Sequence, residues 1–179
     1  HVEIHFTDGS AMVYTDPRRF GFIDHFEASR EAEHPRLKPL GPEPLTEWTS
    51  EAFATRLRDC QKAIKTSLLD QKFVVGVGNI YACEALFGAG LSPRRKAGTV
   101  RGGRAERLVT AIRTVLRRAI EDGGTSLRDH VQPGGEIGYF VQRLSVYGRA
   151  GESCHACGSE IRAITQSGRS SFYCPACQR

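Results

Sequence analysis

Four cysteines in the last quarter of the sequence have the spacing of a metal site. Cys154-x2-Cys157 and Cys174-x2-Cys177 are separated by sixteen residues. Thiolates at this spacing can close a tetrahedral zinc site, and four protein ligands leave no open coordination position. We therefore expect one structural zinc ion. Disulfide bonds are the alternative, and the absence of a secretion signal disfavours them.

The segment between the two cysteine pairs is too short to bury much core, so metal binding would supply most of its folding free energy. Its β-branched residues flank the turn sequence QSGR, residues 166–169, which predicts a hairpin. Arg169 lies at the tip, where its forked donors could grip a phosphate group. A solvated turn residue is the alternative.

A second candidate site lies in the stretch KFVVGVGNIY, residues 72–81. Gly76 and Gly78 let the backbone approach an anion, and a helix beginning near Asn79 offers unpaired N–H groups. Asn79 can donate from its side chain, and Lys65, one helix earlier, could reach the same anion. The stretch lacks the third glycine of a dinucleotide motif. The surrounding basic residues favour a phosphate backbone as ligand; a turn with packing glycines is the alternative.

A third candidate is the sequence DPRRFG, residues 16–21. Arg18, Arg19 and Phe20 would form a compact wedge on one short loop. The aromatic ring can insert between base pairs, and the guanidinium groups can hold base edges. The alternative is that Phe20 packs into a sheet.

Charge is distributed unevenly. Residues 1–59 carry 7 Lys/Arg and 11 Asp/Glu, whereas residues 60–179 carry 18 and 9. Residues 94–118 contain nine basic residues and one acidic residue, Glu106. This asymmetry suggests a polyanion-binding face in the later part, with a solvated helix surface as the alternative.

The composition is that of a soluble globular protein, with 40% hydrophobic and 25% charged residues in 179. No apolar run approaches the roughly 18 residues of a membrane helix. The N-terminal sequence HVEIHFTDGS has no signal-peptide pattern. We expect a cytosolic protein.

Alternating apolar residues predict a β-hairpin over residues 2–15, which we expect to be the edge of a larger sheet. Four prolines in residues 29–47 indicate a linker. Helical spacing follows in residues 47–71, with Thr49 or Ser50 as the N-cap. The apolar positions of this segment are Phe53, Leu57, Cys60 and Ile64.

A further helix is expected from Gly78 or Asn79 to about Phe87, where GAG ends it. The clearest helical pattern stops at the glycine pair 123–124. Its apolar face comprises Leu108, Ala111, Ile112, Val115, Leu116, Ala119 and Ile120. Cys60 and Cys83 lie within helical patterns and are interpreted as small core residues.

In order, the motifs YTDPRRFG, LLDQKFVVGVGNIYACEALFGAGLSP, GYFVQRLSVYGR and the four cysteines resemble the later two-thirds of the formamidopyrimidine-DNA glycosylase family. The resemblance implies a mainly α fold with a small β part: a helix-two-turns-helix module and a C-terminal β-hairpin zinc finger. The implied divisions are strands of an N-terminal β-sandwich (1–28), a linker (29–47), the helix-two-turns-helix domain (48–148) and the zinc finger (149–179).

The implied function is base-excision repair of double-stranded DNA that contains oxidised bases or abasic sites. Enzymes of this family remove 8-oxoguanine and formamidopyrimidines and cleave the strand by β,δ-elimination. Residues 65–86 would form the helix-two-turns-helix module. Lys65 and Asn79 match phosphate contacts beside the lesion. Arg169 matches the finger arginine that grips phosphate and acts in δ-elimination.

By the same resemblance, Arg18 faces the base left unpaired when the damaged nucleotide flips out, Phe20 is wedged beside it, and Arg19 shares their loop. A lid over the flipped base, about residues 125–143, supplies candidate base-pocket residues, which are Arg128, Tyr139 and Phe140.

The family's nucleophile is the amine of an N-terminal proline, which this sequence does not contain. We therefore expect the 179-residue chain to be inactive alone, and to act within a monomeric, nucleoid-associated bacterial enzyme. Two alternatives stay open: an endonuclease VIII-type glycosylase for oxidised pyrimidines, and a non-catalytic zinc-finger DNA-binding module. DPRRFG and GYFVQRLSVYGR argue against the first.

Overall fold

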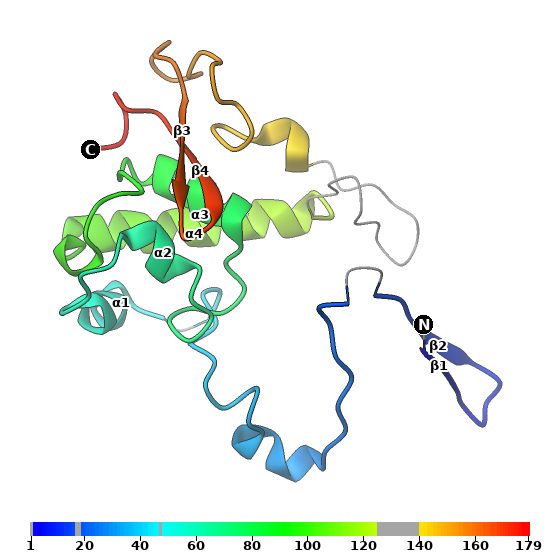
Figure 1. The fold of residues 1–179 in the computed structure, drawn as a ribbon. Helices are drawn as coiled ribbons and strands as arrows, with labels where there is room; N and C mark the ends of the chain where they lie inside the picture. The colour runs from blue at the N-terminus through cyan, green and yellow to red at the C-terminus, as the bar shows by residue number, and fades with distance from the viewer. Residues whose placement is uncertain (1, 17–18, 47, 125–139) are drawn as a thin grey trace. The chain divides into compact units, whose positions relative to one another are not determined.

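A computed structural model describes residues 2–16, 19–46, 48–124 and 140–179 (Figure 1). The chain divides into two compact units, residues 1–38 and 39–179. The predicted site residues Arg18, Arg128 and Tyr139 lie outside the described residues.

The first unit contains the predicted hairpin. Strand β1 (Val2–His5) pairs antiparallel with β2 (Ala11–Tyr14), with Val2 opposite Tyr14. Asp8 shapes the turn by accepting hydrogen bonds from the backbone N–H and hydroxyl of Ser10. Large apolar side chains on this hairpin are half exposed. The larger sheet stays a prediction.

A short 3-10 helix, η1 (Ala28–Glu33), begins the segment that the prolines predict to be a linker. Just after it, the buried His34 ring bonds through Nε2 to the Asp24 carboxylate at 3.0 Å. Its Nδ1 faces the backbone N–H of Arg36 at 3.3 Å, which assigns the proton to Nε2.

In the second unit, α1 (Ser50–Leu57) and α2 (Ile64–Leu68) form the first helical segment. The Thr49 hydroxyl accepts the Ala52 N–H at 3.1 Å, which confirms Thr49 as an N-cap.

Cys60 is not in a helix, contrary to the pattern-based expectation; it lies half buried in the connection between α1 and α2. The physical reason is tertiary. The Ile64 N–H donates to the Arg95 carbonyl at 2.7 Å, and the Ala97 N–H donates to the Lys62 carbonyl at 2.9 Å. This antiparallel bridge replaces the helical hydrogen bonds that would continue α1.

Helix α3 (Asn79–Gly88) has the predicted limits, and α4 (Gly103–Glu121) carries the clearest apolar stripe. Leu108, Ile112 and Leu116 are buried along it. Ile120, predicted on the same face, is 67% exposed. That expectation is wrong because the apolar cluster beside the last turn of α4 covers Ala119 instead.

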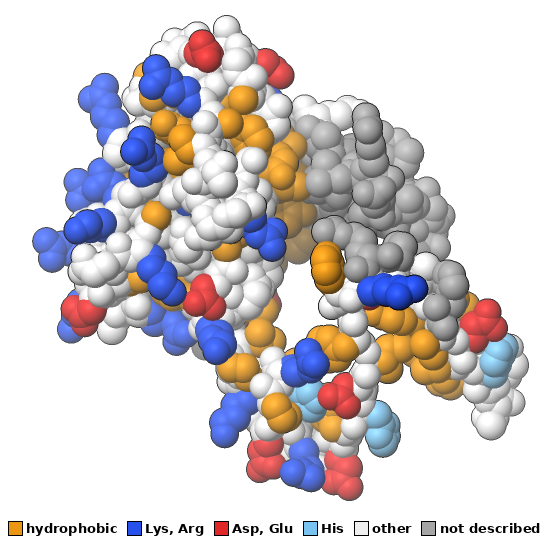
Figure 2. All heavy atoms as spheres, viewed as in Figure 1, with side chains coloured by type: hydrophobic (Ala, Val, Ile, Leu, Met, Phe, Trp, Pro, Cys, Tyr) orange, Lys and Arg blue, Asp and Glu red, His pale blue; other side chains and the backbone are white. Residues whose placement is uncertain are grey.

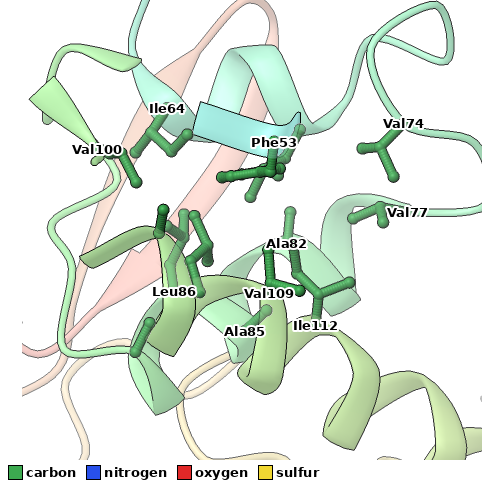
Figure 3. Packing of buried hydrophobic residues seen from close by; sticks show 14 of the residues in the cluster. Phe53, Ile64, Val74, Val77, Ala82, Ala85, Leu86, Val100, Val109 and Ile112 are labelled. Carbon is green, nitrogen blue, oxygen red and sulfur yellow. The ribbon is translucent and has the colours of Figure 1, made fainter. Parts of the chain in front are cut away.

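One core joins α1, α2, α3 and α4 (Figure 3). The Trp48 and Phe53 rings meet edge to face with centroids 4.7 Å apart. The fully buried members include Phe53, Ile64, Leu86, Leu108 and Ile112. Burying these side chains removes apolar surface from water and fixes the angle between α3 and α4.

Arg113 of α4 holds the chain that leads into α1. Its guanidinium donates to the backbone carbonyls of Pro44, Thr46 and Trp48 at 2.9, 2.7 and 2.7 Å. Several donors in one rigid fork suit this set of carbonyls.

The C-terminal hairpin pairs β3 (Arg162–Gln166) with β4 (Arg169–Tyr173) and confirms the predicted turn. Strand β4 packs against α3. The mainly α architecture with small antiparallel hairpins is the expected fold class. Among the described residues, no helix combines the length and apolar character needed to cross a membrane.

Candidate zinc centre and nucleic-acid interface

The four cysteines come together as a metal site. The sulfur atoms of Cys154, Cys157, Cys174 and Cys177 all lie within 4.8 Å of one another. The Cys154–Cys177 and Cys157–Cys174 sulfur distances are 4.0 and 3.5 Å. A tetrahedral zinc with bonds near 2.3 Å would place its sulfurs about 3.8 Å apart, so the cluster fits zinc.

Local groups favour a thiolate at Cys157. Hydrogen bonds from the Ser159 hydroxyl and backbone N–H lower the pKa of the Cys157 thiol to about 6. Hydrogen bonding to Cys157, together with burial, raises the pKa of Cys177 to about 12. A doubly charged cation among the four sulfurs offsets the repulsion between their negative charges.

A buried glutamine ties the metal knuckle to the helical part. The Oε1 atom of Gln178 accepts the Cys174 N–H at 2.8 Å, and its Nε2 donates to the Leu91 carbonyl at 2.9 Å. Leu91 follows α3, so the position of the finger is fixed relative to that helix.

Lys65 and Asn79 converge on the hairpin tip. The Asn79 Nδ2 donates to the Ser170 carbonyl oxygen at 3.0 Å, and the Lys65 Nζ lies 3.5 Å from the same oxygen. Arg169, the neighbour of Ser170, is exposed. The structure therefore brings these three predicted residues together, while their roles stay predictions.

Burial lowers the pKa of Lys65, and the positive charge of Arg169 lowers it further. The side chain of Lys65 is fully buried. The Oδ1 atom of Asn79 is also buried and has no hydrogen-bond partner among the described residues. A nearby anion would relieve the cost of holding the Lys65 and Arg169 charges close together.

The glycines before α3 leave the backbone open. Gly76 has φ +80°, a conformation that favours glycine. Its N–H donates to the Gln71 side chain at 2.9 Å. A Cβ atom at Gly76 or Gly78 would meet nothing within 4 Å, so the backbone is accessible to a ligand.

Glu84 is a residue that sequence reasoning missed. Its carboxylate is buried and accepts the backbone N–H groups of Ser145, Val146 and Tyr147, each at 2.9 Å. The Tyr147 ring packs on Phe172 of β4, and its hydroxyl lies 3.5 Å from the Asn79 Nδ2. Glu84 thus positions the segment that supports the hairpin. The sequence signal was an acid amid the apolar run IYACEALF.

The DPRRFG loop belongs to the first unit. The Asp16 carboxylate accepts the Gly21 N–H at 2.6 Å, which lowers the pKa of Asp16. Arg19 has φ +55°, and Phe20 is 81% exposed. A carboxylate thus closes a tight loop that presents an aromatic side chain to solvent.

Phe140 opens η3 (Phe140–Arg143) and is buried. It packs with Ala119 and Leu144, and its ring meets Tyr81 edge to face at 5.7 Å. Its assignment to the base pocket stays a prediction.

Together, the helical lobe and the four-cysteine hairpin define a zinc-finger protein of the helix-two-turns-helix class. Residues 40–131 match the formamidopyrimidine-DNA glycosylase H2TH domain, and residues 151–179 match the zinc finger found in FPG and IleRS. The chain belongs to the formamidopyrimidine-DNA glycosylase family, and Cys154, Cys157, Cys174 and Cys177 are the ligands of its structural zinc.

Known relatives extend this similarity along the chain. It is 52% identical to formamidopyrimidine-DNA glycosylase of Dinoroseobacter shibae over 100% of its own length, and 53% identical to that of Rhodospirillum centenum over 96%. It spans 64% and 61% of these proteins.

Solved structures of this family are similar to nearly the whole chain. The crystal structure of the MutM (Fpg) protein from Thermus thermophilus superposes with a TM-score of 0.88 at 43% identity, covering 96% of this chain and 65% of that one. Lactococcus lactis Fpg in complex with abasic-site DNA gives 0.89 at 35% identity, covering 99% and 65%.

Removing the metal should unfold the finger and weaken nucleic-acid binding. A zinc chelator is expected to lower the melting temperature and to raise the Kd for duplex DNA, because the hairpin has little core of its own. Metal analysis verifies that the zinc has been removed, circular dichroism measures the melting temperature, and fluorescence anisotropy measures the Kd. Restored binding after added zinc is the control; unchanged melting in metal-free protein would contradict the assignment.

Replacing Glu84 by Gln should destabilise the second unit by about 2 kcal/mol, because an amide nitrogen would face a backbone N–H in a buried site. Urea denaturation followed by circular dichroism measures the loss. Glu106→Gln, an exposed change on α4, is the matched control. Equal stability of the two variants would show that the three hydrogen bonds do not position residues 145–147.

Proposed function

We propose that this chain is the DNA-holding part of a bifunctional glycosylase and AP lyase that removes oxidised purines in base-excision repair. The observation that carries the proposal is the convergence of Lys65, Asn79 and Arg169 around Ser170. Two of these side chains come from the helical lobe and one from the zinc finger. A phosphate group is the anion of DNA that suits such a set of donors.

The geometry favours a fixed position for one stretch of sugar–phosphate backbone. Lys65 contributes a buried positive charge, and an approaching phosphate would restore its pKa toward the ordinary value. Arg169 is exposed at the hairpin tip and can form a two-pronged contact. The open backbone at Gly76 and Gly78 leaves room beside them.

The DPRRFG loop would contact the bases. Phe20 would enter the stack where the damaged nucleotide has left it, and Arg18 would hold the unpaired partner base, with Arg19 beside it. Arg128, Tyr139 and Phe140 would line the pocket for the extruded base. Arg169, which holds a phosphate, would also assist the δ-elimination that completes strand cleavage.

An arginine substitution tests the phosphate contact. Arg169→Ala should weaken binding to a duplex with an abasic-site analogue about tenfold, and should reduce the salt slope of log K by about 0.9, the value for one phosphate. Fluorescence anisotropy between 50 and 200 mM KCl, about the range over which such contacts are screened, measures both. Arg162→Ala removes an exposed arginine at the other end of the same hairpin and is the control. Equal binding by the two variants would remove the basis of the proposal.

Substrate choice provides a separate test. The intact protein that carries this chain should cleave a duplex with 8-oxoguanine faster than one with thymine glycol. Gel analysis of end-labelled strands distinguishes the β- and δ-elimination products. Preference for thymine glycol would assign the protein to the endonuclease VIII branch, and binding without cleavage of either duplex would indicate a non-catalytic module.

A further inference from the structure

A strongly basic loop, residues 92–99, follows α3 and is not used by the proposed phosphate contact. Arg94 and Lys96 are exposed, and Arg95 is half buried. Together with Ser92 and Thr99 they line a shallow hollow of about 450 Å³. Figure 2 shows Lys and Arg side chains gathered along the left edge of the unit that contains this loop.

The basic loop is held on one side by the hairpin tip. The Gln166 Nε2 donates to the Pro93 carbonyl at 3.2 Å. Gln166 is the register partner of Arg169. Arg94 is therefore the residue directly after Pro93, where the loop contacts the hairpin.

On its other side the loop is joined to the start of α2. Lys96 pairs with Ala63 in an antiparallel bridge, and the Ile64 N–H donates to the Arg95 carbonyl at 2.7 Å. Lys65 is the next residue of α2. The basic loop thus lies between the two elements that supply Lys65 and Arg169.

The loop is held by hydrogen bonds to Arg179, and two of its three basic side chains, those of Arg94 and Lys96, are unpaired among the described residues. The Arg95 Nε and the Ser92 N–H both donate to the Arg179 carbonyl, at 3.3 and 3.4 Å. Among the described residues, Arg94 and Lys96 take part in no ion pair, and no carboxylate lines the hollow. Unpaired cations that lie close together raise the local positive potential and attract a polyanion.

We propose that the basic loop is a second phosphate subsite, in which Arg94 and Lys96 bind the backbone of the same nucleic-acid strand beyond the phosphate held by Lys65, Asn79 and Arg169. The inference rests on the proposed function and extends its contact surface. An open hollow with spread charges suits a repeating anion better than a compact one, because a small anion would need converging donors.

The test compares two double variants of equal charge. Arg94→Ala/Lys96→Ala should lower the salt slope of log K by about 1–2, since each lost phosphate contact contributes about 0.9. Arg104→Ala/Arg117→Ala removes two exposed arginines from α4 and should leave the slope nearly unchanged. The ligand is a fluorescent duplex with a central abasic-site analogue, titrated with the 179-residue chain.

Shortening the duplex provides a directional readout. The wild-type chain should lose affinity when the duplex is shortened from one end and not from the other, because the subsite lies on one side of the central phosphate. The Arg94→Ala/Lys96→Ala variant should not respond at that end. Arg94→Gln/Lys96→Gln repeats the experiment with longer side chains retained, and melting temperature and zinc content confirm folding.

The outcomes separate the two proposals. If the basic-loop and α4 double variants bind alike, or if both ends of the duplex matter equally, the second subsite is excluded, whereas a weakened Arg169→Ala variant would still support the proposed function. If Arg169→Ala also binds as well as wild type, the proposed function fails and the subsite, which depends on it, fails too.

Discussion

The helical lobe is joined to the zinc finger by hydrogen bonds to the backbone carbonyl oxygen of Ser170. Asn79 and Lys65 both reach this oxygen, so a backbone atom of the finger occupies the centre of the candidate interface. The arrangement depends on the finger being folded, because Ser170 is the residue directly after the hairpin turn. A structural metal thus determines where distant side chains can act.

Buried polar groups do much of the positioning around this point. Glu84 gathers three backbone N–H groups of residues 145–147, and Gln178 links a cysteine of the finger to the residue after α3. Each would be costly if unpaired, and each has its hydrogen bonds satisfied by a specific segment. Such groups select one arrangement of the helices and the finger over alternatives that would bury equal apolar area.

Features with a local cause could be predicted from the sequence. The cysteine pairs, the QSGR turn, the Thr49 cap and the limits of α3 all follow from neighbouring residues, and the structure contains them. The break after α1 could not be predicted, because it results from pairing with residues 95–97. Glu84 and Arg113 were also missed as contacts, since their partners lie far away in sequence.

The candidate site was predictable in part for the same reason. Lys65, Asn79 and Arg169 could be selected by residue type and by resemblance, but their meeting at Ser170 depends on the packing of β4 against α3. Ile120 is the opposite case. The apolar spacing of α4 continues to this residue, beyond the part of the helix that the core covers, so its side chain is exposed.

Gly98, in the basic loop, packs so closely against backbone atoms of another segment that it leaves no space for a side chain. A Cβ atom there would lie 2.7 Å from the Arg58 carbonyl oxygen, and backbone atoms cannot move aside as a flexible side chain can. A methyl group at this position would push the loop away from Leu57, Arg58 and Cys60, at the end of α1. The tolerance of this position to substitution is therefore set by steric exclusion, and an alanine would displace the neighbouring cations without removing any charge.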